Sequence, residues 1–248
     1  LYASNGVALG KAGCKKVGIL QIDGTDFLTD YVAAGAESEG AKVVGRAPIP
    51  ANAPDLTPAI AKLTGEGADC IALSVAPSQV VQAVTAINQT GKKLQMAAVA
   101  AILTPEVLES LGDLANGIIL VDGVLNAADP APGIKKVTKQ IKAVDSSADI
   151  TEVGLFSYVG GRLLATGLKS VTGTPTKESV TTALNGLRDV EVEGIIHPYS
   201  AIELPTPDFT RFFNHYGISY KIVKGKPKAQ GTFFDLAEIL ESVTAASQ

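Results

Sequence analysis

The sequence lacks most of the features that mark a catalytic or nucleic-acid-binding protein. Its 248 residues include no tryptophan, two cysteines and only 5% aromatic residues. No GxxxxGK[ST] or GxGxxG motif follows its first predicted strand and no GxSxG motif is present, so neither a phosphate-binding loop nor a hydrolase nucleophile is indicated. Because the net charge is −4 and no Lys/Arg run exceeds a pair, the sequence shows no electrostatic footprint for nucleic acid or an anionic membrane.

Membrane-spanning and metal-binding patterns are also missing. No apolar run approaches the roughly 20 residues that span a bilayer, so no direct membrane insertion is expected. No signal peptide or lipid-anchored cysteine opens the sequence, which says nothing about export if a preceding part is missing. The only histidines, His197 and His215, lie in loop-like sequence without cysteines or carboxylates at metal-ligand spacing. We therefore predict no metal and no cofactor.

What the sequence does contain is a regular alternation of short apolar runs with segments of helical length. This alternation predicts βαβ units that feed a parallel sheet. The predicted strands are residues 17–22, 43–44, 70–75, 94–99 and 118–121. Right-handed crossovers favour the spatial order 2-1-3-4-5, a doubly wound α/β sheet. A Pro-rich crossing, RAPIPANAPD, is expected after the second strand, and the helix at 26–39 places Phe27, Tyr31 and Ala34 on one side.

The pattern changes after Asp122, where a helical segment replaces the strands. Its middle helix repeats Phe156, Val159, Leu163 and Leu168 on one face, so that face needs something to pack against. No set of strands in this segment could supply a sheet. Three helices are predicted, at residues 134–144, 153–171 and 177–187, and then strands within 213–234 and a short helix at 236–243.

Four stretches carry a family resemblance. VGILQID, DLTPAIAKL, GADCIAL and VVQAVTAINQTGKK, in this order and spacing, resemble the second lobe of type I periplasmic binding proteins. The resemblance is to the branch typified by leucine/isoleucine/valine-binding proteins, the solute receptors of ABC importers. It implies a second lobe formed by residues 13–122 and 216–248, and a mostly helical remainder of the first lobe, formed by 1–12 and 123–215. Because relatives begin with a parallel α/β half, we expect a fragment, or a fold completed by another chain.

The resemblance implies a receptor and not an enzyme. Two lobes would close around a small organic ligand, carboxylate or amino-acid-like, and a membrane permease would recognise the closed form. The location implied is periplasmic or extracellular. The alternative is a ligand-sensing regulatory or receptor domain of the same fold, which signals and does not transport. An α/β enzyme is a third possibility, which a bound nucleotide or metal would favour.

The candidate ligand residues follow from the topology and the resemblance together. Ligands of open parallel sheets bind beyond the carboxyl ends of the strands, where the strand order reverses. In the family, the loops after the first, third and fourth strands form this lobe's share of the cleft. The candidates are Asp23, Thr25, Asp26, Phe27, Ser74, Ala76, Ser78 and Ala100. Structural alternatives stay open: Asp23 and Thr25 as helix caps, Phe27 as core, Ser74 and Ser78 as turn or cap groups.

Ala100 bears on the class of ligand. It stands where amino-acid-binding relatives carry a carboxylate for the ligand ammonium, and the stretch reads AVAAIL. A buried ammonium without a partner would cost on the order of several kcal/mol. We therefore expect a ligand with an apolar body that lacks an essential α-amino group, such as an aromatic or aliphatic carboxylate. The shortage of aromatic residues argues against a carbohydrate.

The two cysteines are expected to form a disulfide. Cys14 precedes the first strand and Cys70 opens the third, and these strands are neighbours in the predicted order, about 4.8 Å apart. The Cα separation then falls within the ~4.4–6.8 Å that a disulfide needs. The alternative is two small residues buried at strand ends. A bridge would argue for an oxidising compartment.

Overall fold

The computed structural model describes residues 1–203 and 213–246, without the side chains of the last three, and divides into two units. Unit 1 comprises Leu1–Asp122 and Gly217–Gln248, and unit 2 comprises Gly123–Tyr216. None of the described helices combines the length and the apolarity that crossing a bilayer requires.

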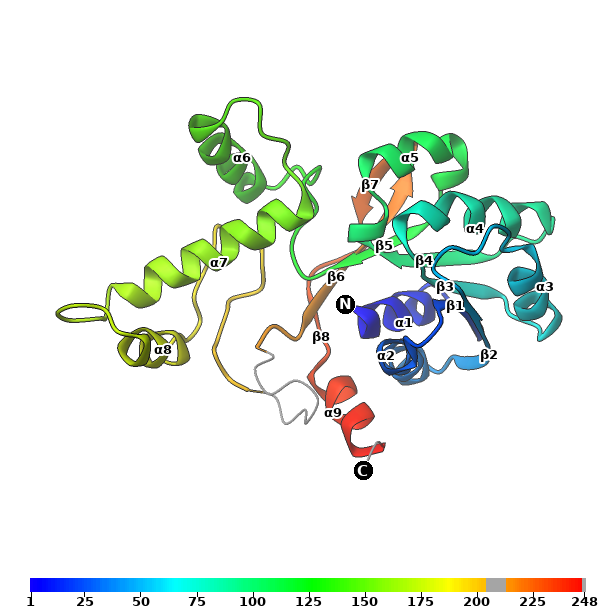
Figure 1. Ribbon diagram of the computed structural model, residues 1–248, viewed down its shortest axis with the longest axis horizontal. Coiled ribbons are helices and arrows are strands. Elements are labelled where there is room, and N and C mark those ends of the chain that lie inside the picture. Colours follow the sequence, from blue (N-terminus) through cyan, green and yellow to red (C-terminus); the bar gives the residue numbers. More distant parts are fainter. Residues whose placement is uncertain (204–212, 247–248) are drawn as a thin grey trace. The chain divides into compact units, whose positions relative to one another are not determined.

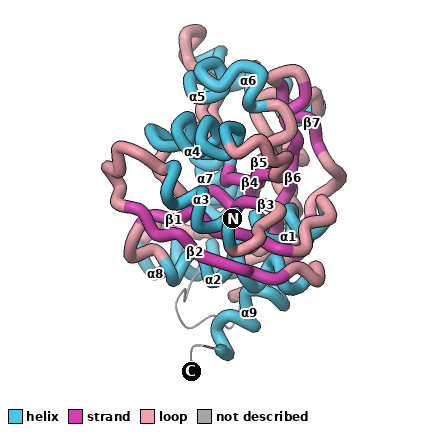
Figure 2. Tube along the Cα trace, turned by 90° about the vertical axis from the view of Figure 1, so that its right-hand side faces the viewer, coloured by secondary structure: helices cyan, strands magenta, loops and turns pink. Residues whose placement is uncertain are grey.

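Unit 1 is built on one mixed sheet. Its strand order is β2-β1-β3-β4-β5-β6-β7, with β8 paired to β6, so the predicted order 2-1-3-4-5 is confirmed. The first five strands are parallel, whereas β6 pairs antiparallel with β5 and β7 pairs antiparallel with β6. β6 and β7 lie at one edge of the sheet (Figure 2). The strands are β1 (Lys16–Ile22), β2 (Lys42–Ile49), β3 (Cys70–Ser74), β4 (Gln95–Val99), β5 (Ile119–Asp122), β6 (Tyr216–Val223), β7 (Lys226–Ala229) and β8 (Phe234–Asp235).

Helices cover both faces of this sheet (Figure 1). α1 (Tyr2–Lys11) and α2 (Asp26–Ser38) lie on one face, with α9 (Ala237–Ala246) against α2. The other face carries α3 (Thr57–Gly65) and α4 (Pro77–Gln89), and α5 (Pro105–Leu111) packs on α4. Two short 3-10 helices, η1 (Ala100–Ile102) and η2 (Gly112–Ala115), flank α5. α4 packs because its apolar residues recur at helical spacing: Val80, Ala83, Val84 and Ile87 are buried.

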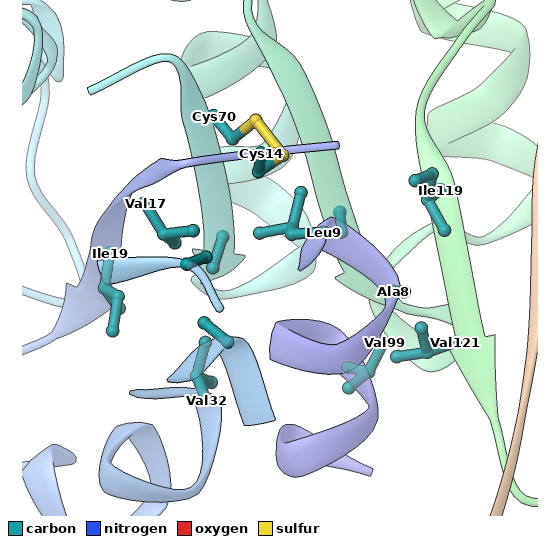
Figure 3. Close-up of a cluster of buried hydrophobic side chains, with 14 residues drawn as sticks. Ala8, Leu9, Cys14, Val17, Ile19, Val32, Cys70, Val99, Ile119 and Val121 are labelled. Carbon is teal, nitrogen blue, oxygen red and sulfur yellow. A yellow bond between two sulfur atoms is a disulfide. The ribbon is translucent and has the colours of Figure 1, made fainter. Parts of the chain in front are cut away.

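The core under α1 and α2 joins the helices to four parallel strands. Leu9 of α1 and Val32 of α2 are fully buried beside Val17 and Ile19 of β1 (Figure 3). Full burial of an aliphatic side chain contributes roughly 1.5–3 kcal/mol, so this cluster stabilises unit 1 strongly. The near-continuous apolarity of the parallel strands, which are buried on both faces, is what made the strands themselves predictable.

A disulfide closes the amino edge of this core. Cys14 and Cys70, the pair expected from the sequence, are bonded with their Cα atoms 6.0 Å apart (Figure 3). Both residues are buried, and the backbone N–H of Cys14 donates to the carbonyl oxygen of Leu9 at 3.2 Å. The bridge therefore ties the end of α1 to the start of β3.

The position of α1 differs from the sequence-based expectation. Residues 1–12 were expected to belong with the helical segment 123–215, whereas α1 packs within unit 1. The reason is close packing of small residues: a Cβ atom added to Gly35 of α2 would lie 2.1 Å from the carbonyl oxygen of Ala3, and one on Gly6 would lie 2.0 Å from that of Val32. The assignment of the two units to the two lobes of a binding protein stays a prediction.

Strand β2 is longer than predicted. The sequence suggested a strand at 43–44 and a Pro-rich crossing from Arg46, but β2 continues through Pro48 to Ile49. Proline is tolerated in β2 because β2 is an edge strand that pairs only with β1. On the side of β2 that faces no other strand, the N–H group that proline lacks would have no hydrogen-bond partner in the sheet.

Unit 2 contains the three predicted helices. They are α6 (Pro132–Val144), α7 (Glu152–Leu168) and α8 (Lys177–Asn185). Within the described part of unit 2, the only β-type pairing is the isolated bridge between Val190 and Tyr199. The predicted apolar stripe of α7 is unevenly covered: Val159 is buried, while Phe156 and Leu168 are each 38% exposed.

A candidate ligand site at the carboxyl edge of the sheet

The carboxyl ends of β1, β3 and β4 meet at one edge of the unit 1 sheet. Gln21 of β1 pairs with Ser74 of β3, and Leu73 pairs with Ala98 of β4. The three loops that leave these strands therefore start from neighbouring positions. The helix after β1 lies on one face and the helix after β3 on the other, so the switch point falls between β1 and β3.

The first loop presents one free carboxylate. Asp23 is exposed and has no side-chain partner among the described residues, and its backbone N–H donates to Ile49 at 2.9 Å. Thr25 is the N-cap residue of α2, but its hydroxyl donates backward to the carbonyl oxygen of Ile22 at 2.6 Å. Neither side chain caps the helix, which leaves Asp23 available to a ligand.

Asp26 is held by a polar network, centred on the buried side chains of Gln21 and Thr29, that was not predicted from the sequence. Its Oδ1 atom accepts from Nε2 of Gln21 at 2.9 Å, and the amide oxygen of Gln21 accepts from the hydroxyl of Thr29 at 2.8 Å. Arg46 donates to Thr29 at 2.9 Å and forms a 2.6 Å ion pair with Asp30. Gln21 and Thr29 are fully buried. A glutamine inside an otherwise apolar strand, VGILQI, was the available signal.

Phe27 is not a core residue. Phe27 is 60% exposed, which excludes the core position that stayed open as an alternative from the sequence. α2 instead buries Thr29, Val32 and Ala36 toward the sheet. Since each helical residue turns by about 100°, Phe27 falls on the opposite side from Thr29. An exposed phenyl ring beside Asp26 gives this edge an apolar contact surface.

The second loop carries an unsatisfied hydroxyl. Oγ of Ser74 is buried and has no hydrogen-bond partner among the described residues. Ala76 is the N-cap of α4 and its N–H donates to Oε1 of Gln79 at 3.4 Å, while Gln79 Nε2 donates to the Pro50 carbonyl at 3.0 Å. Ser78 is exposed in the first turn. A helix N-terminus without a side-chain cap favours an anion.

The third loop is small and apolar. Ala100 is buried at the start of η1, directly after the core residue Val99. The next polar group, Thr104, accepts from the N–H of Val107 at 3.4 Å and so caps α5. The structure thus places the eight predicted residues at the ends of β1, β3 and β4, in the segments that follow them and in the first turns of the next helices. Whether they contact a ligand stays a prediction.

The two histidines belong to unit 2, and the disulfide of Cys14 and Cys70 lies at the amino edge of the unit 1 sheet. His197 stacks on Tyr216 with ring centroids 3.5 Å apart, and His215 lies 4.4 Å from the same ring, all within unit 2. Among the described residues, the only cluster with metal-like geometry is Cys14, Asp69 and Cys70, and its two sulfur atoms are bonded to each other.

Comparison with known families decides the identity of the fold. Residues 7–209 match the model of a family described as periplasmic binding protein. The chain belongs to the periplasmic binding protein family. This confirms the resemblance drawn from the sequence. A search of curated proteins finds no match.

Solved structures show the same fold at low identity. A leucine-binding protein from Thermotoga maritima is 14% identical with a TM-score of 0.74, covering 95% of this chain and 66% of its own. A branched-chain amino acid ABC transporter protein from Thermus thermophilus with bound valine is 15% identical, with a TM-score of 0.75. The match covers 97% of this chain and 67% of the Thermus thermophilus chain. A solute-binding protein from Rhodopseudomonas palustris in complex with 4-hydroxybenzoate is 21% identical, with a TM-score of 0.73. The match covers 94% of this chain and 65% of the Rhodopseudomonas palustris chain. This binding protein chain therefore spans about two thirds of the length of each.

Proposed function

We propose that the protein is the extracytoplasmic solute receptor of an ABC importer and that it binds a small organic carboxylate without chemical conversion. The observation that carries the proposal is the pairing of an unsatisfied hydroxyl, Ser74, with an uncharged third loop at Ala100. The ligand would be gripped by closure of lobes, and the closed form would be presented to a membrane permease.

The site chemistry favours a carboxylate over an amino acid. Ser74 and the first turn of α4 offer donors and a positive helix end, which suit a carboxylate group. Residues 100–105, which follow β4, include no carboxylate for an ammonium. Phe27 offers an apolar surface and Asp23 an acceptor, which suits a ring that carries a hydroxyl. Proteins of this fold include both a valine-bound and a 4-hydroxybenzoate-bound member, so the fold accommodates either class.

Calorimetric titration tests the ligand class. We expect benzoate or a hydroxybenzoate to bind and leucine to bind far more weakly. Tight leucine binding that exceeds that of the acids would overturn the carboxylate proposal.

A pair of serine variants tests the role of Ser74. Ser74→Ala should weaken carboxylate binding by about tenfold, the loss of one hydrogen bond to a charged group. Ser110→Ala is the matched control, because Ser110 is exposed on α5 and its hydroxyl only donates to the carbonyl oxygen of Glu106. Equal affinities for the two variants would remove Ser74 from the site.

The importer role and the location need a separate test. The family and the ABC transporter proteins among its structural neighbours support both, and the Cys14–Cys70 bridge is suited to an oxidising compartment. Cells that lack the gene should lose high-affinity uptake of the identified carboxylate. Normal uptake with a lost transcriptional or chemotactic response would favour the sensing alternative.

A further inference from the structure

Four lysines gather on the hairpin formed by β6 and β7. Residues 221–228 contain four lysines and no acidic residue, in a chain whose net charge is −4. Because the lysines alternate with other residues, the sequence shows no basic run. The fold brings the charges together at the edge of the sheet, where β6 and β7 lie side by side (Figure 2). We call Lys221, Lys224, Lys226 and Lys228 the lysine hairpin.

The strand register places three of these lysines on one face. Lys221 lies directly opposite Lys228, and Val223 lies directly opposite Lys226. Directly opposed residues share a face, and side chains alternate along a strand. Lys221, Lys226 and Lys228 therefore project to the same side of the hairpin, together with Val223. Ile222, which alternates with them, is buried. Like charges directly opposite each other destabilise a strand pair.

The turn also carries a lysine at an unfavourable position. Lys224 has φ of 52° and Gly225 has φ of 72°, so both turn residues are left-handed, as in a type I′ turn. Asparagine, aspartate and glycine are the usual occupants, because a longer side chain is strained there. The turn is held in place by Asn116, whose Oδ1 atom accepts from the N–H of Gly225 at 3.1 Å.

None of these charges is neutralised inside the described molecule. No ion pair within residues 1–203 and 213–243 involves any lysine of the hairpin. Lysines on an outer strand discourage sheet-to-sheet aggregation, which accounts for Lys226 and Lys228 on β7. Protection against aggregation does not account for Lys221, which lies on the inner strand β6, or for Lys224, which lies in the turn. Both weaken the fold without an internal partner, which points to an external anion.

We propose that the lysine hairpin docks on an anionic membrane surface. Lysine ammonium groups are flexible point charges that suit a diffuse layer of phosphates, whereas arginine suits fixed bidentate pairing with carboxylates. Val223, 44% exposed between the lysines, adds an apolar contact at the same face. Charge complementarity and the flat display on an edge strand therefore favour lipid headgroups over an acidic protein.

The position of the hairpin agrees with the proposed receptor role without depending on it. β6 runs antiparallel to β5, and the N–H of Ile222 donates to Ile118 at 2.9 Å, so the turn lies at the amino edge of the parallel strands. The candidate ligand site lies at the carboxyl edge of the same unit. Docking through the hairpin therefore leaves that edge of unit 1 open to solutes.

Vesicle co-sedimentation tests the proposal. The probes are vesicles of phosphatidylcholine alone and vesicles that also contain phosphatidylglycerol. We expect binding to the second kind only, weakened by salt as the Debye length shortens. The variant K221Q/K224Q/K228Q should lose affinity on the order of 100-fold, about fivefold per lysine. The control K135Q/K139Q/K142Q removes three exposed lysines from α6 in unit 2 and should retain binding.

Each other outcome overturns the proposal. Equal losses in the two triple variants would mean that binding follows net charge alone. Binding to phosphatidylcholine vesicles, or no binding to either kind, would exclude an anionic-lipid site. Tighter binding to a polyglutamate peptide than to the vesicles would indicate an acidic protein partner instead. Thermal unfolding of the hairpin variant should match or exceed that of the parent, because the substitution removes a like-charge pair, so lost binding cannot reflect misfolding.

Discussion

The two units of this chain are stabilised by different kinds of interaction. Unit 1 buries its helices on a sheet, and fully buried residues such as Leu9, Ile19 and Leu73 fill both faces. Unit 2 has helices without a sheet in its described part. Six of the ten large hydrophobic side chains left exposed in the described residues lie in unit 2, although it is the smaller unit: Val144, Val153, Phe156, Leu164, Leu168 and Ile202.

Unit 2 replaces buried area with local polar interactions. Glu193 binds Lys136 of α6 and Arg162 and Tyr158 of α7, which ties two helices to one loop. Threonine side chains cap both α7 and α8, whereas α2, α3 and α4 of unit 1 have no side-chain cap. Since most helix stability in proteins comes from the packing of an apolar face, a helix packed on a sheet depends less on its cap than a half-exposed helix does, although Thr104 caps α5 of unit 1 and no side chain caps α6 of unit 2. We expect unit 1 to respond to changes in packing and unit 2 to changes in polar groups.

The largest effect is expected from the disulfide. The double variant C14A/C70A should destabilise unit 1 by ~3–4 kcal/mol, because the bridge closes a loop between residues 56 positions apart. Amide hydrogen exchange should accelerate in β1 and β3 and stay unchanged in α7. The control is a titration of free thiols in the denatured, unreduced parent protein. Two reactive thiols in that titration would contradict the bridge.

The second largest loss of stability is expected from a substitution at the contact between α1 and α2. Gly35→Ala would place a Cβ atom 2.1 Å from the carbonyl oxygen of Ala3, so the helices must separate, at a cost of about 2–3 kcal/mol. Gly160→Ala in α7 is the matched control. Nothing lies within 4 Å of its added Cβ atom, so it should stabilise α7 by about 0.5–1 kcal/mol. Urea unfolding measures both, and equal effects would remove the packing difference between the units.

The sheet of unit 1 could be predicted because its signal is local. Strands such as VGILQI are apolar on both faces, and a doubly wound order follows from right-handed crossovers. The three helices of unit 2 were also visible as apolar periodicity. β2 was cut short in the prediction because Pro48 suggests a loop, and only its edge position shows that proline is tolerated.

The candidate site was less predictable because it depends on register. The loops could be located from the strand ends, but the polar network around Asp26 could not. Gln21, Thr29 and Arg46 meet only when β1, α2 and β2 are assembled. The lysine hairpin was missed for the same reason, since Lys221 and Lys228 become neighbours through strand pairing. The free hydroxyl of Ser74 likewise follows from its surroundings and not from its type.

A smaller effect is expected from Glu193. The hydrogen bond from Lys136 holds the pKa of this carboxyl below its ordinary value of 4.5, with help from the charges of Lys136 and Arg162 and against the effect of burial. A lowered pKa means that the stabilisation is present above pH 4.5 and is lost as the pH falls through the lower, folded-state pKa. Glu193→Gln should cost unit 2 about 1–2 kcal/mol at neutral pH and flatten its acid dependence.

Exposed Glu191 provides the control for that measurement. Glu191→Gln removes the same charge two positions away, from a side chain without a partner among the described residues. Hydrogen exchange of α6 and α7 as a function of pH separates the two variants. If both variants lose the acid dependence equally, it arises from net charge and not from the Glu193 cluster.

The smallest effect concerns the helix caps. Thr176 accepts from the N–H of Ser179 at 3.1 Å, and the Ser179 hydroxyl accepts from the N–H of Thr176 at 2.9 Å, a reciprocal capping pair. No side chain of α8 is fully buried, so Thr176→Ala should cost about 1 kcal/mol and speed amide exchange in α8 about fivefold.

Thr104→Ala is the counterpart in unit 1, since Thr104 caps α5 through the N–H of Val107. α5 buries Leu111 and packs on α4, so its ends are held by more than the cap, and we expect a loss of about 0.5 kcal/mol. An equal or larger loss in α5 would mean that packing on the sheet layer does not replace a cap, and the contrast between the two units would then rest on buried area alone.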